Sequence, residues 1–150
     1  MTRQPLQLVA GLAERLIDPA SHSLTLADCR RPDMPLIWVN RGFENMTGYT
    51  REEAAGRNCR FLQGPETDRG AVAKMKACLN AKEAAIVDLL NYRKDGTTFW
   101  NRLSITPVRN RQGETTHFIG IQSDITRMRQ LQDQLYEFAL ELGAYVRTDG

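Results

Sequence analysis

The C-terminal half of the chain carries three strand-like segments, residues 84–93, 98–108 and 114–125, which are separated by only a few residues. Both separating sequences, residues 94–97 (KDGT) and 110–113 (NRQG), are typical of β-hairpin turns. A connection between parallel strands needs a dozen or more residues, so segments joined this tightly must pair antiparallel. Together with the helices predicted elsewhere, they place the chain in the α+β class.

The remaining residues predict two further strands and several short helices. Two short segments, residues 23–28 and 35–39, have the composition of strands. Thr50 and Glu53 have the spacing of a capping box, which predicts a brief helix that Gly56 ends. The other predicted helices span residues 6–17, 40–48, 58–63 (one or two turns) and 67–79. We therefore expect a five-stranded antiparallel sheet, with most of the short helices between its second and third strands.

Residues 127–146 predict a long C-terminal helix with an apolar seam. The seam residues are spaced alternately four and three apart: Leu131, Leu135, Phe138, Leu142 and Tyr145. Such a seam is typical of a coiled coil, and it equally suits a helix that folds back on its own sheet. The sequence leaves both alternatives open.

Composition narrows the functional classes. The apolar fraction is 41% and the charged fraction 25%, as in ordinary globular domains, and no apolar run is long enough to span a membrane. The 20 Lys and Arg are interleaved with 18 Asp and Glu, which disfavours binding to nucleic acid. Three cysteines without a C-x-x-C pair, and only two histidines, favour neither a disulfide framework nor a metal site. A cytoplasmic location is expected.

The alternation of side chains along the last three strands places three amides among apolar residues. Asn91, Asn101 and Gln122 each share a strand face with apolar or small neighbours. These neighbours are Val87, Leu89, Leu103, Ile105, Phe118 and Gly120. A buried amide without a hydrogen bond costs about 1–3 kcal/mol, so the three amides indicate a planar polar ligand that both donates and accepts. Gly120 would let a flat group approach the backbone. The alternative is that the amides lie at an edge or on the surface.

In the first hairpin, the number of loop residues determines which residues of the two strands lie opposite each other. If Asn91 lies opposite Asn101, the loop contains an odd number of residues, and we expect residues 95–97. A two-residue loop would instead place Asn91 opposite Trp100.

Residues 56–64, GRNCRFLQG, place Cys59 between an amide and a guanidinium. A lone cysteine is most often a small core residue, but Arg60 is difficult to bury without an anion. Free backbone amides at the start of a helix favour a phosphate there. Lys76 is the second expected cation, and Arg69 is a weaker candidate.

This segment resembles the photoactive motif of LOV domains, the blue-light-sensing branch of the PAS fold. The resemblance continues through residues 65–68 (PETD), 91–96 (NYRKDG), 99–101 (FWN) and 118–122 (FIGIQ). It implies a LOV core of the PAS type at residues 23–126. An N-terminal helical cap at residues 1–22 would precede this core, and an amphipathic helix for signalling or dimerisation would follow at residues 127–150.

The resemblance also implies the photochemistry. LOV domains bind flavin mononucleotide non-covalently in the dark, and Cys59 matches the cysteine that adds reversibly to the flavin C4a carbon under blue light. An unperturbed thiol has a pKa near 8.5, so Cys59 should be protonated in the dark, and light rather than a base drives the addition. Gln122 matches the glutamine near flavin N5, which relays the protonation of N5 to the flanking helices.

The other cofactor-binding positions follow from the same resemblance. Asn58 and Gln63 match residues that contact the ribityl chain and the ring system, and Arg60 matches a phosphate ligand. Asn91 and Asn101 match the pair that bonds the pyrimidine edge of the ring. The remaining positions are Leu62, Val72, Met75, Lys76, Leu89, Leu103, Phe118 and Gly120.

Two positions depart from the family pattern. Lys76 stands where arginine is common, and a lysine offers a point charge instead of a bidentate fork. We therefore expect a looser contact with phosphate, and some bound riboflavin or FAD. Ala27 stands where a hydroxyl side chain often lies near the ring.

The resulting functional prediction is a blue-light photoreceptor with no enzymatic activity of its own. The expected partners are a second copy of the chain, bound through the terminal helices, and an unidentified effector protein; neither nucleic acid nor a membrane is expected. One alternative is the sensor part of a longer chain, such as a histidine kinase. Others are a flavin-free PAS interaction module, a heme sensor and a cysteine hydrolase, although the last two lack an axial ligand or a base near the pocket.

Overall fold

The computed structural model describes residues 22–148, so the helix expected at residues 6–17 lies outside the described residues. Within residues 22–148 every predicted element is present, with ends that differ by two residues at most. The strands are β1 (Ser23–Asp28), β2 (Leu36–Val39), β3 (Ala85–Tyr92), β4 (Thr98–Arg109) and β5 (Thr115–Asp124). The helical elements are α2 (Arg41–Thr47), α3 (Arg51–Ala54), the 3-10 turn η1 (Cys59–Leu62), α4 (Arg69–Asn80) and α5 (Thr126–Thr148).

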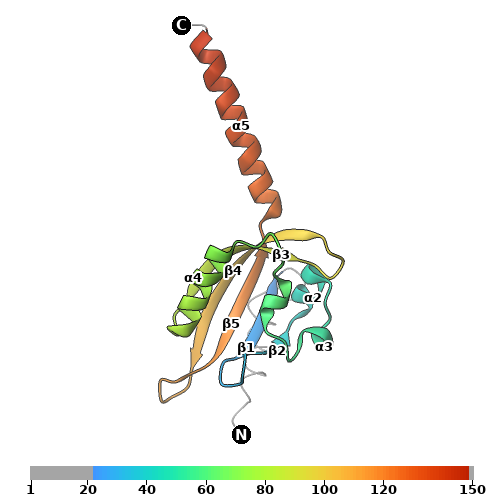
Figure 1. Cartoon of the computed structure of the whole chain (residues 1–150), viewed down its shortest axis with the longest axis vertical. Helices are drawn as coiled ribbons and strands as arrows, with labels where there is room; N and C mark the ends of the chain where they lie inside the picture. The colour runs from blue at the N-terminus through green and yellow to red at the C-terminus, as the bar shows by residue number, and fades with distance from the viewer. Residues whose placement is uncertain (1–21, 149–150) are drawn as a thin grey trace.

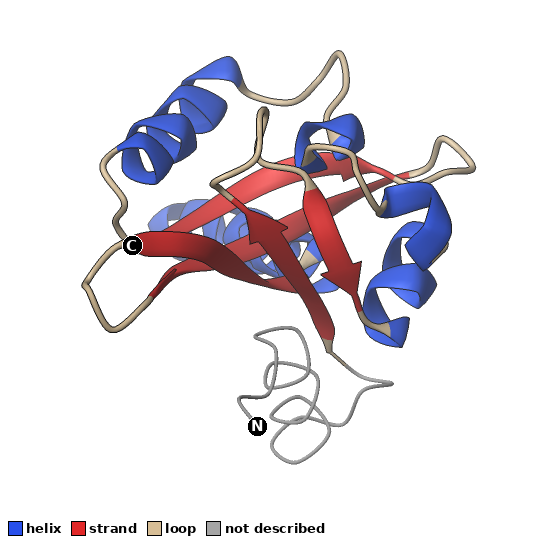
Figure 2. Cartoon of the chain, turned by 90° about the horizontal axis from the view of Figure 1, so that it is seen from below, coloured by secondary structure: helices blue, strands red, loops and turns tan. Residues whose placement is uncertain are grey.

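The five strands form one antiparallel sheet in the order β2-β1-β5-β4-β3. The two C-terminal hairpins place β3, β4 and β5 side by side, and β1 then pairs with β5 across a large sequence separation. The short helices and α4 lie over one face of this sheet (Figures 1 and 2). The α+β class and the five-stranded antiparallel sheet are confirmed.

Local capping explains the short helices. The Asn40 side chain accepts hydrogen bonds from the backbone N–H of Phe43 at 3.0 Å and of Leu24 at 2.8 Å, so it both begins α2 and ties it to β1. Gly48 ends α2 with a φ of 79°, a conformation that glycine adopts without strain. The predicted capping box of Thr50 and Glu53 begins α3.

Two apolar clusters lie between the sheet and the helices. The first contains Ala27, Leu36, Val39, Phe43, Ala54 and Leu62, under the short helices. The second contains Met75, Val87, Leu89, Leu103, Ile105 and Phe118, between α4 and the strands β3 to β5. Met34, in the loop between β1 and β2, packs against both clusters.

Helix α5 extends away from the sheet after β5 (Figure 1). Its base is fixed to β4, because the Trp100 backbone N–H donates to the Thr126 hydroxyl at 2.9 Å and the Arg129 guanidinium lies 3.8 Å from the Trp100 ring. The seam side chains are 47% to 67% exposed: Leu131, Leu135, Phe138, Leu142 and Tyr145. The seam therefore does not fold back on the sheet, which removes that alternative. Among the described residues, no helix is both long and apolar enough to cross a bilayer.

Candidate functional site

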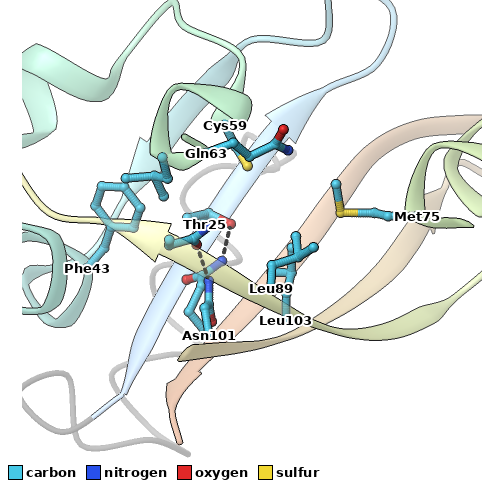
Figure 3. Close-up of a pocket in the computed structure, with 11 residues that line it drawn as sticks. Thr25, Phe43, Cys59, Gln63, Met75, Leu89, Asn101 and Leu103 are labelled. Carbon is cyan, nitrogen blue, oxygen red and sulfur yellow. Dashed lines mark hydrogen bonds between the residues drawn. The ribbon is translucent and has the colours of Figure 1, made fainter. Parts of the chain in front are cut away.

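Two adjoining spaces lie between the sheet and the helices. We call them the large cavity, of about 550 Å³, and the inner pocket, of about 20 Å³. Five residues line both spaces: Thr25, Cys59, Gln63, Met75 and Leu103. Figure 3 shows the side chains that line the inner pocket. A cavity of this size matches the range found for small-molecule and cofactor sites.

The structure brings all the predicted site residues to these two spaces. The inner pocket is lined by Cys59, Leu62, Gln63, Met75, Leu89, Asn91, Asn101, Leu103 and Gln122. The large cavity adds Asn58, Arg60, Val72, Lys76, Phe118 and Gly120. Phe43 and Thr25 also line the inner pocket and were not predicted.

Cys59 is the first residue of η1, and its sulfur points toward the inner pocket (Figure 3). The turn forms because the Asn58 side chain accepts from the Arg60 backbone N–H at 3.0 Å. Burial raises the pKa of the Cys59 thiol to about 11, although the neighbouring Arg60 charge acts in the opposite direction. A pKa raised in this way favours the protonated thiol at neutral pH.

Gln122 is held by two hydroxyl groups from the neighbouring strand β1. Ser23 donates its hydroxyl hydrogen to Gln122 Oε1 at 2.6 Å, and Gln122 Nε2 donates to Thr25 Oγ1 at 3.0 Å (Figure 3 shows the second bond). All three residues are buried. Ser23 and Thr25 were missed, although they alternate with Leu24 along the predicted strand and so share its inner face.

Gly120 has a role beyond the one expected. A Cβ atom at this position would lie 2.5 Å from Thr25 Oγ1 and 2.8 Å from Gln122 Nε2. The absence of a side chain therefore makes room for the hydroxyl and the amide, rather than only for the approach of a flat ligand. Gly120 still lines the large cavity.

The expected pairing of the two asparagines needs correction. Asn91 lies opposite Phe99, and Asn101 lies opposite Leu89, so the two amides are diagonal neighbours on one face. The loop has an odd number of residues, as expected, but it comprises residues 94–96, because the Arg93 N–H donates to the Thr97 carbonyl at 2.8 Å.

The diagonal still lets the two amides meet. Asn101 Nδ2 donates to Asn91 Oδ1 at 2.9 Å. Asn101 is only 2% exposed, and its Oδ1 has no hydrogen-bond partner among the described residues. A buried carbonyl of this kind is a ready acceptor for the N–H of a ligand.

Among the described residues, five cations line the large cavity: Arg31, Arg60, Arg69, Lys76 and Lys82. Arg31 and Lys82 were not predicted. Arg69, the weaker candidate, donates at 3.4 Å to Gln63 Oε1 and at 3.3 Å to the Gly64 carbonyl. The Arg60 guanidinium is hydrogen-bonded to the carboxylate of Asp33, a contact that the sequence did not indicate.

Comparison with known proteins decides the family. A model of the PAS domain family matches residues 25–127. The solved LOV domain of a blue-light-activated histidine kinase from Erythrobacter litoralis EL346 is 47% identical, with a TM-score of 0.68. The match covers 70% of this chain and 96% of that domain. This chain belongs to the PAS family as a LOV domain.

Longer relatives carry the same domain beside other parts. A blue-light photoreceptor of Listeria monocytogenes is 44% identical over 85% of this chain, which spans 50% of that protein's length. A solved RNA-binding light-oxygen-voltage receptor is 37% identical, with a TM-score of 0.79, over 95% of this chain and 40% of that one. These likenesses support a blue-light photoreceptor function for this LOV domain and imply a flavin chromophore.

The residues of this LOV domain fit a flavin. The unpartnered Asn101 Oδ1 offers an acceptor to a ring N–H, and the apolar clusters offer two walls to a flat ring. Cations at the large cavity suit an anionic tail. Among residues 22–148, no group of three or more His, Cys, Asp or Glu side chains is placed to hold a metal ion.

Proposed function

We propose that this LOV domain senses blue light by binding flavin mononucleotide and using Cys59 as its photoactive thiol. A bound flavin would supply, after excitation, an electrophilic C4a carbon. Cys59 would supply the sulfur that bonds to it reversibly and the thiol proton that N5 takes up. The observation that carries the proposal is that a half-buried thiol lines the same inner pocket as a buried amide carbonyl, that of Asn101, which has no hydrogen-bond partner among the described residues.

The amides and cations determine how the cofactor is held. Asn91 and Asn101 lie on one face of the sheet, on β3 and β4, and would present a donor and an acceptor to the pyrimidine edge. Arg60 and Lys76 line the large cavity, where they would neutralise the phosphate of the cofactor. The apolar walls exclude water from the thiol, and burial keeps that thiol protonated until light arrives.

Gln122 is proposed to relay the protonation of N5. Protonation would change flavin N5 from a hydrogen-bond acceptor to a donor. The Gln122 amide must then turn to present its oxygen to N5, or two donors would face each other. Its present partners, the hydroxyls of Ser23 and Thr25, can each donate or accept. The amide can therefore turn without losing either partner, and the change passes to β1 and β5 together.

Strand β5 ends at the base of α5. Asp124, two residues after Gln122, accepts hydrogen bonds from the backbone N–H of Thr126 at 3.0 Å and from its hydroxyl at 2.6 Å. The Thr126 hydroxyl in turn accepts from the Trp100 N–H. A shift of β5 at Gln122 therefore reaches the first turn of α5 through direct bonds.

The output is proposed to pass through α5 to a second copy of the chain and to a separate effector, with no catalysis by the sensor itself. The exposed apolar seam supports a coiled-coil homodimer, because large apolar patches are rarely left open to water. The alternative is that this LOV domain is the sensor part of a longer kinase chain. Its similarity to the LOV domain of a histidine kinase supports this alternative, in which the same apolar seam would form the coiled coil.

An absorption spectrum in the dark, after a blue flash and during recovery tests the proposal. We expect a structured flavin band that bleaches and returns, and Cys59→Ala should keep the flavin while abolishing the bleach. Mass analysis of the released flavin identifies the mononucleotide, riboflavin or FAD. A protein that binds no flavin even after reconstitution would instead be a PAS interaction module.

A further inference from the structure

Asp33, in the loop between β1 and β2, is tied to the segment around Cys59 by the two side chains that flank the cysteine. Asn58 Nδ2 donates to the Asp33 carbonyl at 2.7 Å, and the Arg60 guanidinium donates to the Asp33 carboxylate. Asp33, Asn58 and Arg60 all line the large cavity.

The backbone of this loop depends on those contacts. Asp33 has a φ of 67° and Met34 a φ of 45°, in the left-handed region of backbone conformation that residues other than glycine rarely adopt. Such a conformation persists where surrounding contacts hold it. Here the holding groups are Asn58 and Arg60 on one side, and the two apolar clusters that enclose Met34 on the other. The Asp33 carboxylate is thus held beside Arg60 instead of moving freely in water.

This arrangement opposes the proposed role of Arg60. A phosphate that approaches the guanidinium must share it with the Asp33 carboxylate or displace that group. The phosphate also carries negative charge of its own, so it is repelled by Asp33 at short range. A flavin without a phosphate meets neither penalty.

We infer that Asp33 is a specificity-determining residue, which reduces the preference of the cavity for flavin mononucleotide over riboflavin by competing with phosphate for Arg60. The inference rests on the proposed flavin binding. Both side chains are more than half exposed, so the competition is moderate. An ion pair of this kind changes an equilibrium constant by about fivefold at most, and the added repulsion acts in the same direction.

The test compares Asp33→Asn with the wild type. Asparagine keeps the size of the side chain and tolerates a positive φ, so the loop should hold its shape. Flavin-free protein is titrated separately with flavin mononucleotide and with riboflavin, and the quenching of flavin fluorescence gives each Kd. We expect the ratio of the riboflavin Kd to the mononucleotide Kd to rise about three- to tenfold in Asp33→Asn. Because both ligands meet the same preparation, the ratio is insensitive to the folded fraction.

Two controls separate this effect from others. Glu52→Gln removes the same charge from an exposed residue of α3 that lines neither cavity, and the ratio should stay unchanged. In an Arg60→Gln background, Asp33→Asn should alter the ratio much less than in the wild type, because the competition needs Arg60.

The outcomes separate the two proposals. If the wild type binds the mononucleotide and the ratio does not move in Asp33→Asn, this inference is overturned while the proposed function stands. An equal rise in Glu52→Gln assigns the effect to overall charge and also overturns the inference. Binding of neither flavin overturns the proposed function, and this inference with it.

Discussion

Replacing Asn101 by leucine should weaken the binding of flavin while leaving the stability of the flavin-free LOV domain nearly unchanged. Asn101 Oδ1 is buried and has no partner within residues 22–148, while Asn101 Nδ2 donates to Asn91 Oδ1 at 2.9 Å. Leucine removes the lone acceptor, which relieves about 1–3 kcal/mol, but it leaves Asn91 Oδ1 without its donor at a similar cost. The two effects nearly cancel, so the free energy of unfolding of the flavin-free protein should change by less than about 1 kcal/mol.

The affinity should behave differently. A ring N–H that loses its acceptor should bind more weakly by about 1–3 kcal/mol, which is about 5- to 150-fold in Kd for flavin mononucleotide. Urea unfolding of the flavin-free variants measures the stability, and fluorescence titration measures the affinity.

Asn91→Leu is the matched control. It strips the donor Asn101 Nδ2 of its partner while leaving Asn101 Oδ1 unpartnered as before. Without flavin, the free energy of unfolding of Asn91→Leu should therefore be about 1–3 kcal/mol below that of the wild type, whereas that of Asn101→Leu should be nearly unchanged. The reasoning is refuted if Asn101→Leu binds the mononucleotide as tightly as the wild type does, or if the two variants are equally destabilised.

Three further predictions concern other parts of the molecule. The Cys59 thiol has its pKa raised from 9.0 to about 11 in the folded protein, so its contribution to the unfolding free energy should be constant below about pH 9 and be lost between about pH 9 and 11. Urea unfolding should show a smaller fall in Cys59→Ala, and equal falls would contradict the burial of the thiol. Gly120→Ala should lower the unfolding free energy by about 1–3 kcal/mol by displacing Thr25 or Gln122, whereas Gly143→Ala, with open space around its Cβ, should be neutral or slightly stabilising. Leu135, which is 67% exposed, should support self-association, so Leu135→Glu should shift sedimentation equilibrium toward monomer; an unchanged mass, or the same shift in Gln134→Glu, would exclude the seam.

The ends of helices and the turns were predictable where interactions between residues close in sequence determine them. The capping box at Thr50 and the turn glycines fix element ends locally, so their places follow from the sequence. The hairpin register was not predicted, because it depends on a side chain inside the turn. Asp95 Oδ1 accepts from the backbone N–H of Thr97 at 2.9 Å and from its hydroxyl at 2.7 Å, which closes the loop one residue earlier than expected.

The site was predictable where its residues lie in one motif or follow from the alternation of side chains along each strand. Cys59 and the amides were identified in this way, and the structure gathers them around the cavity. The Asp33 contact could not be predicted, because it joins segments 27 residues apart whose meeting depends on the whole sheet. The direction of α5 was equally open, since an apolar seam suits either a sheet or a second helix.

The attachment of α5 has a mechanical consequence. The helix is 23 residues long, which corresponds to about 34 Å, and Figure 1 shows it leaving the body at one end. A rigid rod of that length, tilted by about 10° at its base, moves at its far end by about 6 Å. The contact between Arg129 and Trp100 at 3.8 Å lies within the first turn, close to the pivot of such a lever. A tilt of this size at the end of β5 would thus be amplified to the width of a side chain at the tip.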